Sequence, residues 1–171
     1  MLVLLLVAGN ETTTNLIGNA VLAFMEHPDQ LHRIYDDPSL LPSAIEEVLR
    51  FSSPVQATAR VAMRDTEVSG RTVHAGQQAV TWLAAANRDP EVFPDPDTFD
   101  VARTPNRHLS FGLGIHFCLG APLARMEARI ALGAFLAHIQ RFRRADDGPL
   151  PRVPTFIMRG VRSLPITYRG R

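Results

Sequence analysis

The sequence predicts a mainly α-helical fold with a few small β-sheets, and three observations lead to this prediction. Two long apolar segments, residues 2–26 and the stretch after Cys118, have the pattern of buried or amphipathic helices. Between them, β-branched residues and turn residues alternate in short runs, which suggests small strands. With 171 residues, of which 46% are hydrophobic and 20% charged, the chain has the composition of an ordinary globular protein.

Charge and cysteine content limit the possible function classes. The net charge of +1 argues against a dedicated nucleic-acid binder, which usually presents a strongly basic face. A single cysteine cannot form an internal disulfide, so a cytoplasmic setting is expected. The apolar run over residues 2–8 is far shorter than the roughly 20 residues of a membrane span. We therefore expect no membrane segment in this chain.

The first third of the chain is predicted to be helical. Residues 2–26 are apolar nearly all round, and this pattern ends before Pro28, which disfavours helical geometry at the residue that precedes it. Two shorter helices are expected further along, over residues 29–36 and 43–51. In the second of these, Ser43 and Glu46 have the spacing of a capping box, in which each side chain satisfies a backbone N–H of the first turn.

The middle of the chain is predicted to form a hairpin and then a long irregular segment. β-branched residues flank a turn at Ser69 and Gly70, which is typical of two short strands. A short helix is expected over residues 79–86. Residues 87–117 contain four prolines and no sustained periodicity, and an irregular segment of this length tends to be functional.

Helical order is predicted to return after Cys118. Apolar residues follow one another there at helical spacing, and Pro122 suits the first turn of a helix. One face carries Leu119, Leu123, Met126 and Ile130, and the apolar stripe continues with Leu132, Leu136 and Ile139. Short strands are expected in the tail, residues 143–171, most clearly over 162–169.

The segment FGLGIHFCLG, residues 111–120, contains the one cysteine of the chain among three glycines. A thiol near a helix N-terminus faces unpaired backbone N–H groups, which favour the thiolate. Gly112, Gly114 and Gly120 allow positive φ angles and let the backbone wrap closely beside a large flat group. The plainer alternative is that Cys118 is a small buried hydrophobic residue and the glycines only form turns.

Three chemistries could use such a thiolate. Structural zinc needs about four ligands, and Cys118 with His116 leaves that set incomplete. A cysteine hydrolase needs a base, for which spacing does not distinguish His108, His116 and His138. Haem iron needs a single protein ligand on its proximal side, and cysteine thiolate is one of the known choices. The single cysteine therefore fits haem best.

Residues 111–120 resemble the cysteine-ligand signature of the cytochrome P450 family, which has Phe, Gly, Cys and Gly at fixed spacing. The residues at these places are Phe111, Gly114, Cys118 and Gly120. The resemblance implies the mainly helical P450 fold with small sheets, haem b as the cofactor and the Cys118 thiolate as the ligand of its iron.

The segment AGNETT in the first predicted helix is similar to the oxygen-activation segment of the same family. By this resemblance, Glu11 and Thr12 are an acid and alcohol pair that delivers protons to O₂ bound at the iron. Ala8 and Gly9 would contact the haem, and Gly9 would let the helix open locally. The alternative is a surface glutamate followed by ordinary threonines.

Glu47 and Arg50 resemble the family's Glu-x-x-Arg pair. At this spacing the two side chains share a helix face, although most such pairs are solvated and contribute little. In the family the pair is buried with an arginine from the proline-rich segment, and Arg103 lies at the matching place. This network would hold residues 87–117 in place.

By the same resemblance, Arg60 and His116 match positions that hold the haem propionates. An arginine suits a carboxylate because its two N–H groups can bind both oxygens. For Arg60 the alternative is an exposed charge on a strand, and for His116 a loop residue without a ligand. The remaining haem contacts implied by the resemblance are Ala8, Gly9, Phe111, Gly112 and Gly120.

The resemblance implies a monooxygenase that inserts one oxygen atom from O₂ into a small apolar organic substrate. Electrons would come from an external donor such as a ferredoxin with its reductase. Arg125 and Arg129 are a candidate docking site for it, and the alternative is an ordinary solvated basic face. An apolar wall of the substrate pocket is expected from Val3, Leu4, Val7, Ala8 and residues 54–59.

Members of this family are much longer than this chain. Residues 1–171 would be the C-terminal portion of a single P450 domain without its N-terminal half, and we expect them alone to bind haem weakly or not at all. The alternative function is that of a non-catalytic remnant that serves as a structural or partner-binding module.

Overall fold

The structure is a computed structural model and describes residues 2–170, leaving aside the side chains of residues 2, 4 and 5. The helices are α1 (Leu2–Glu26), α2 (Pro28–Asp36), η1 (Pro38–Leu40), α3 (Leu41–Phe51), α4 (Leu83–Ala86), η2 (Gly114–His116) and α5 (Ala121–His138). The strands are β1 (Thr58–Val61), β2 (Thr66–Val68), β3 (Arg71–Val73), β4 (Gln78–Thr81), β5 (Ile139–Arg144) and β6 (Ile166–Gly170). The predicted mainly helical fold with small sheets is therefore confirmed.

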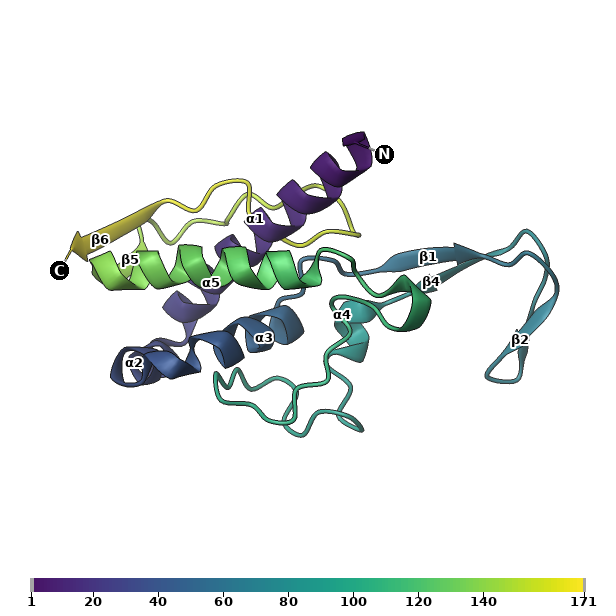
Figure 1. The fold of residues 1–171 in the computed structure, drawn as a ribbon, viewed down its shortest axis with the longest axis horizontal. Coiled ribbons are helices and arrows are strands. Elements are labelled where there is room, and N and C mark those ends of the chain that lie inside the picture. The colour runs from purple at the N-terminus through teal and green to yellow at the C-terminus, as the bar shows by residue number, and fades with distance from the viewer. Residues whose placement is uncertain (1, 171) are drawn as a thin grey trace.

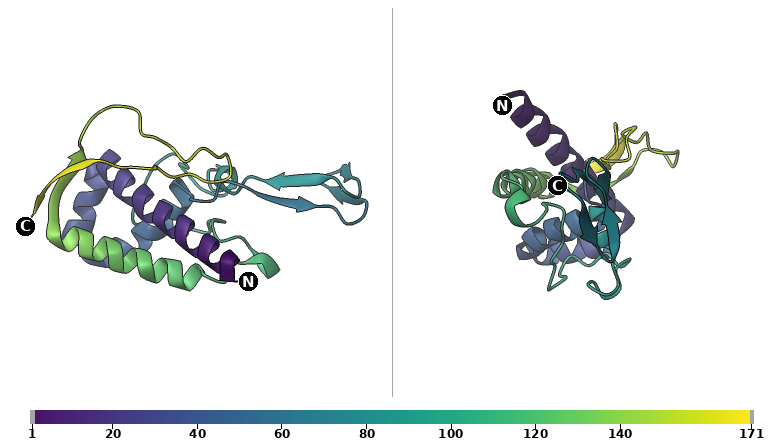
Figure 2. Two further views of the ribbon diagram at one scale, coloured as in Figure 1. Left: turned by 90° about the horizontal axis from the view of Figure 1, so that it is seen from above. Right: turned by 90° about the vertical axis from the view of Figure 1, so that its right-hand side faces the viewer.

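The helices form the body of the molecule and the strands lie at its two ends (Figure 1). α1, α3 and α5 contact one another and enclose the hydrophobic core, in which Leu16, Phe24, Val48 and Leu132 are buried. Three antiparallel pairs, β1 with β4, β2 with β3, and β5 with β6, form separate two-stranded sheets. The ribbon of β1 to β4 extends away from the helices, as a second view also shows (Figure 2).

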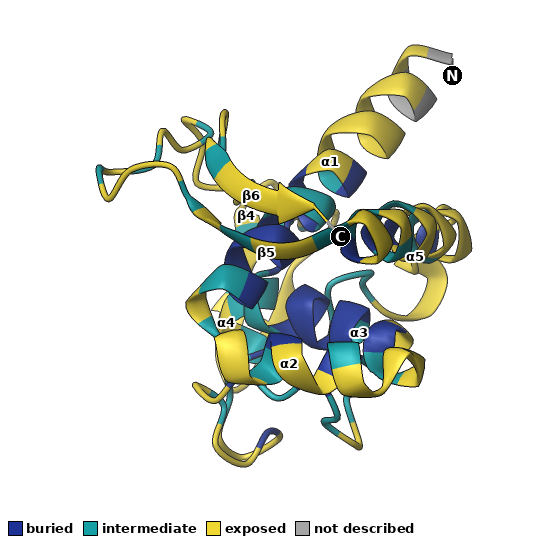
Figure 3. Ribbon diagram, turned by 90° about the vertical axis from the view of Figure 1, so that its left-hand side faces the viewer, coloured by how far each residue is buried: buried dark blue, intermediate teal, exposed yellow. Residues whose placement is uncertain are grey.

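The N-terminal part of α1 projects beyond the other helices (Figure 3). Its described side chains are exposed there, with Leu6 and Val7 at 71% and 58%, whereas Leu16 further along the helix is 2% exposed. The helix has the predicted bounds and ends before Pro28, which begins α2. Within residues 2–170, no helix combines the length and apolarity that crossing a membrane requires.

The capping box predicted for Ser43 and Glu46 is wrong. α3 begins earlier, at Leu41, because the 3₁₀ turn η1 leads directly into it and Pro42 fits its first turn, where no N–H is needed. Ser43 thus lies inside the helix, and its hydroxyl donates to the carbonyl oxygens of Leu40 (2.9 Å) and Val101 (2.7 Å).

The short helix predicted over residues 79–86 is half wrong. Residues 78–81 form β4 and pair with β1, because the β-branched residues there suit a strand and a partner is available. Only residues 83–86 are helical. In the tail, β5 begins before the predicted region, at Ile139, and β6 largely overlaps the segment that was most clearly predicted as a strand.

α5 has Pro122 in its first turn, as predicted, and the predicted apolar stripe is buried at Leu132 and Leu136 but not in its first half. Ala121, Ala128, Leu132 and Leu136 are buried. The predicted face is exposed at Leu119 (88%), Leu123 (52%), Met126 (47%) and Ile130 (62%). The apolar stripe of this helix is therefore wider than the part that the rest of the described chain covers.

Candidate functional site

The loop before α5, residues 108–120 and called the cysteine loop below, presents Cys118 at the surface. The amide of Cys118 donates to the carbonyl oxygen of Phe111 (2.8 Å), which closes the glycine-rich part of the loop. Gly112 has a φ of 72°, and a Cβ at this position would lie 3.3 Å from the carbonyl oxygen of His116. The positive φ angle therefore favours glycine there, and the space leaves little room for a side chain.

Cys118 lies where two cavities meet. One, of about 490 Å³, is lined mostly by apolar groups from α1, β1 and the cysteine loop, a composition typical of ligand pockets. Among the predicted site residues it includes Ala8, Thr12, Arg60, Phe111, Gly112, His116 and Cys118. The other, of about 440 Å³, lies between α1 and α5 and includes Ala8, Gly9, Thr12, Phe111, Cys118 and Gly120.

Of the two residues predicted to deliver protons, Glu11 lies apart from these cavities. It is exposed on α1 and is absent from the lining of both. The Thr12 hydroxyl donates to the Ala8 carbonyl oxygen at 2.7 Å, a bond within the helix. α1 runs through Gly9 without interruption, so the local opening predicted at this glycine is not present. Glycine permits such an opening, but the regular hydrogen bonding of the helix continues past it.

The predicted wall of the substrate pocket is present in part. Pro54, Val55 and Thr58 line the larger cavity. Val3 and Val7 are 75% and 58% exposed and are not part of the cavity lining, because they lie on the projecting end of α1. The side chain of Leu4 lies outside the described residues.

Glu47 and Arg50 form a buried ion pair at the centre of the scaffold. The Nε and Nη2 atoms of Arg50 each donate to one carboxylate oxygen of Glu47, both at 2.8 Å, and both side chains are fully buried. Arg103 donates through Nε to Oε1 of Glu47 at 3.2 Å. The structure thus brings together the three residues that the sequence suggested, two from α3 and one from the irregular segment.

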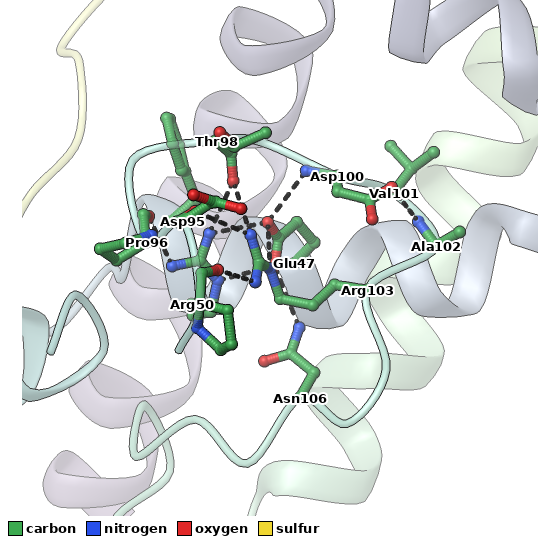
Figure 4. Close-up of polar contacts among 12 residues, drawn as sticks. Glu47, Arg50, Asp95, Pro96, Thr98, Asp100, Val101, Ala102, Arg103 and Asn106 are labelled. Carbon is green, nitrogen blue, oxygen red and sulfur yellow. Dashed lines mark hydrogen bonds and ion pairs between the residues drawn. The ribbon is translucent and has the colours of Figure 1, made fainter. Parts of the chain in front are cut away.

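This cluster holds the irregular segment by its backbone (Figure 4). Arg50 donates to the carbonyl oxygens of Pro96 (2.8 Å) and Thr98 (3.0 Å), and Arg103 donates to that of Pro94 (2.8 Å). The amide group of the Asn106 side chain, which the sequence did not single out, adds a bond to Glu47 at 3.1 Å. Buried charges are tolerated only when they are paired and hydrogen-bonded, and these conditions are met here.

A second ion cluster links α3, the cysteine loop and α5, and the sequence reasoning missed it. Glu46 accepts two bonds from Arg125 (2.7 and 2.8 Å) and lies 2.9 Å from Nε2 of His108. Burial opposes ionisation of Glu46, but the bonds and charges of Arg125 and His108 outweigh it and lower the pKa of the carboxyl group to about 2. The guanidinium of Arg125 also lies 4.5 Å from the ring centre of Phe111.

Arg125 has a partner within the chain. Glu46 binds its guanidinium group and raises its pKa, while the side chain remains 37% exposed. Its role in docking an electron donor stays a prediction. Arg129, one turn further along α5, is exposed. The sequence singles out His108 only as one of three candidate bases, and its spacing from Glu46 and Arg125 does not indicate this contact.

A sequence model described as "Cytochrome P450" matches residues 1–163, nearly the whole chain. The chain belongs to the cytochrome P450 family. It is 48% identical over 166 residues to the biotin biosynthesis cytochrome P450 of Bacillus subtilis, covering 97% of this chain and 42% of the relative. It is also 48% identical over 174 residues to the vitamin D(3) 25-hydroxylase of Pseudonocardia autotrophica, covering 100% of this chain and 43% of that protein.

Solved P450 structures share the fold in detail. Substrate-free CYP109E1 from Bacillus megaterium superposes with a TM-score of 0.95 and 43% identity, covering 99% of this chain and 44% of that structure. The chain thus spans about two fifths of the length of the P450s that it matches. P450 proteins carry haem, and the cysteine loop of this chain has the family's ligand signature.

Proposed function

We propose that this chain is the C-terminal, haem-ligating portion of a single P450 domain. The whole enzyme would be a monooxygenase that inserts one oxygen atom from O₂ into a small apolar organic substrate. The observation that carries the proposal is the position of Cys118, an exposed thiol where two mainly apolar cavities meet. The relative named vitamin D(3) 25-hydroxylase supports hydroxylation of an apolar compound.

The residues around Cys118 fit haem b. A porphyrin has two apolar faces and two carboxylates at one edge, and the larger cavity combines an apolar lining with two basic side chains, Arg60 and His116. Arg60 is exposed, and its guanidinium group donates to the carbonyl oxygen of its neighbour Ala59 at 2.9 Å. Such a surface group can turn to bind a propionate. Gly112 adds no side chain to the cavity wall.

Bound haem would supply the iron at which O₂ is activated. The Cys118 thiolate would donate electron density to that iron, and its backbone bond to Phe111 would fix the direction of the sulfur. Thr12 would hold a proton at its hydroxyl oxygen after turning from the Ala8 carbonyl into the cavity. Glu11, which is exposed on the same helix, would renew that proton from solvent.

Electrons would come from an external donor, a ferredoxin with its reductase. The proposed monooxygenation consumes electrons, and protein side chains do not supply them. A cytoplasmic location is part of the proposal, because an exposed thiol that must remain a ligand needs a reducing compartment.

The test is titration of the protein with haemin, followed by reduction under CO. We expect the Soret band that is typical of thiolate-ligated haem once haemin is saturating, with weak affinity for the 171 residues alone. A band typical of imidazole ligation, or the spectrum of free haemin at saturation, would contradict the proposal.

A further inference from the structure

A buried polar cluster joins the cysteine loop to the end of α3. Its members are Ser53, which follows α3, Asn87, which ends α4, and Ser110, which precedes Phe111 in the loop. Ser53 and Asn87 are 1% and 0% exposed. Ser110 is partly buried and also lines the larger cavity, but that mostly apolar lining does not explain why three polar side chains meet here.

The two serines make the same bonds. The hydroxyl of Ser110 donates to the carbonyl oxygen of Leu49 at 2.6 Å, and that of Ser53 does so at 2.7 Å. Nδ2 of Asn87 donates to the Ser110 oxygen at 2.9 Å and to the Ser53 oxygen at 2.8 Å. The Leu49 carbonyl belongs to the last turn of α3, where no helical N–H is available to it, so the hydroxyls satisfy a group that would otherwise lack a partner.

Asn87 completes the connection through its other atoms. Its Oδ1 accepts the amide N–H of Leu109 at 2.7 Å, and its backbone carbonyl accepts a bond from the buried Arg50 at 3.0 Å. Asn87, which binds the start of the cysteine loop, is therefore itself bound by Arg50 of the central ion cluster.

We propose that Ser110 is a positioning residue for the Cys118 ligand, which rests on the proposed function of Cys118 in binding haem. Ser110 is bound to the rigid end of α3, and the next residue, Phe111, accepts the amide of Cys118 at 2.8 Å. The hydroxyl of Ser110 thus sets where the Phe111 carbonyl lies and, through it, where the sulfur lies. Ser53 makes equivalent bonds and also lies 3.0 Å from the hydroxyl oxygen of Ser110, but it belongs to no part of the loop.

This symmetry provides a matched control, Ser110→Ala against Ser53→Ala. Each variant removes one hydroxyl from the same cluster, so both should lower the midpoint of urea unfolding by a similar amount. A purely structural role predicts that the two variants also resemble each other in every other measurement.

The decisive readouts are hydrogen exchange at the Cys118 amide without haemin and the haemin affinity of the protein. We expect Ser110→Ala to lose protection at that amide and to bind haemin roughly tenfold more weakly, which is the usual effect of removing a group that supports a ligand. Ser53→Ala should keep both at wild-type values. The Leu109 bond to Asn87 remains in both variants, so the loop should not detach completely.

The proposal would be overturned if both variants lost amide protection and haemin affinity equally. Unchanged exchange at the Cys118 amide in Ser110→Ala would also overturn it. Hydrogen exchange keeps this test separate from the proposed function. If the wild-type protein did not bind haemin through its thiolate, the proposed function would fail, but the exchange rates would still show whether Ser110 positions the loop.

Discussion

The charged centre of the scaffold and the cysteine loop both give fixed shape to segments without regular secondary structure, but they do so in opposite ways. Around Glu47, carboxylate oxygens and carbonyl groups are bound by buried guanidinium groups. In the cysteine loop, positive φ angles at Gly112 and Gly114 and several backbone bonds, among them that from Cys118 to Phe111, define the backbone. Its apolar side chains are largely outside, with Leu113 at 76% and Ile115 at 97% exposed.

The difference indicates how function is distributed over the molecule. Changes at the charged centre should act on stability, because removing a partner leaves other charges buried without one. Changes in the loop should act on ligand chemistry, because its side chains contribute little to the core.

Glu47→Gln should have the largest effect on stability. The substitution keeps the size of the side chain but leaves the guanidinium groups of Arg50 and Arg103 without their anion. We expect the free energy of unfolding to fall by about 3–5 kcal/mol, the usual result of breaking a buried ion pair from one side. Urea denaturation followed by circular dichroism measures this, with Glu67→Gln on the exposed strand β2 as a control that should leave stability unchanged.

If Glu47→Gln cost less than about 1 kcal/mol, as is usual for a surface ion pair, the charged centre would not organise the scaffold. The contrast between the two regions would then disappear.

Glu46 should have a smaller effect, which appears as a dependence of the free energy of unfolding on pH. Because the folded protein holds the pKa of this carboxyl group at about 2, below its ordinary value of 4.5, ionised Glu46 stabilises the fold above about pH 4.5. This stabilisation should be lost as the pH falls from 4.5 toward 2. Glu46 is partly exposed, so screening by solvent leaves on the order of 1–2 kcal/mol.

The measurement is the free energy of unfolding as a function of pH for the wild type and Glu46→Gln, with Glu127→Gln on the exposed side of α5 as the control. The difference between wild type and Glu46→Gln should shrink as acid is added. A difference that stayed constant from neutral pH to pH 2 would show that Arg125 and His108 do not act on Glu46 as a charge.

Features that depend on neighbouring residues could be predicted from the sequence, and features that depend on distant residues could not. The end of α1 before Pro28 follows from local backbone geometry, and it was predicted correctly. The prediction of a capping box was wrong because α3 begins at Leu41, directly after the 3₁₀ turn η1. The spacing of Ser43 and Glu46 contains no information on that turn.

The ion pair between Glu46 and Arg125 joins residues 79 positions apart, so nothing in the local sequence indicates it. Ser110 and Ser53 are 57 positions apart and were missed for the same reason. Arg103 is likewise far from Glu47 and Arg50 in the sequence. This contact was predicted only because the three residues resemble a family motif. For such contacts, the sequence of a single chain gives the residue types but not their partners.

The account depends most on the Cys118 thiolate as the ligand of haem iron, and replacing this residue tests it most directly. Cys118 is exposed, so Cys118→Ala should leave the unfolding midpoint unchanged. The haemin-loaded variant, reduced under CO, should lack the thiolate-type Soret band that we expect of the wild type. A variant that kept this band would contradict the account, because the ligand of the iron would then be another group.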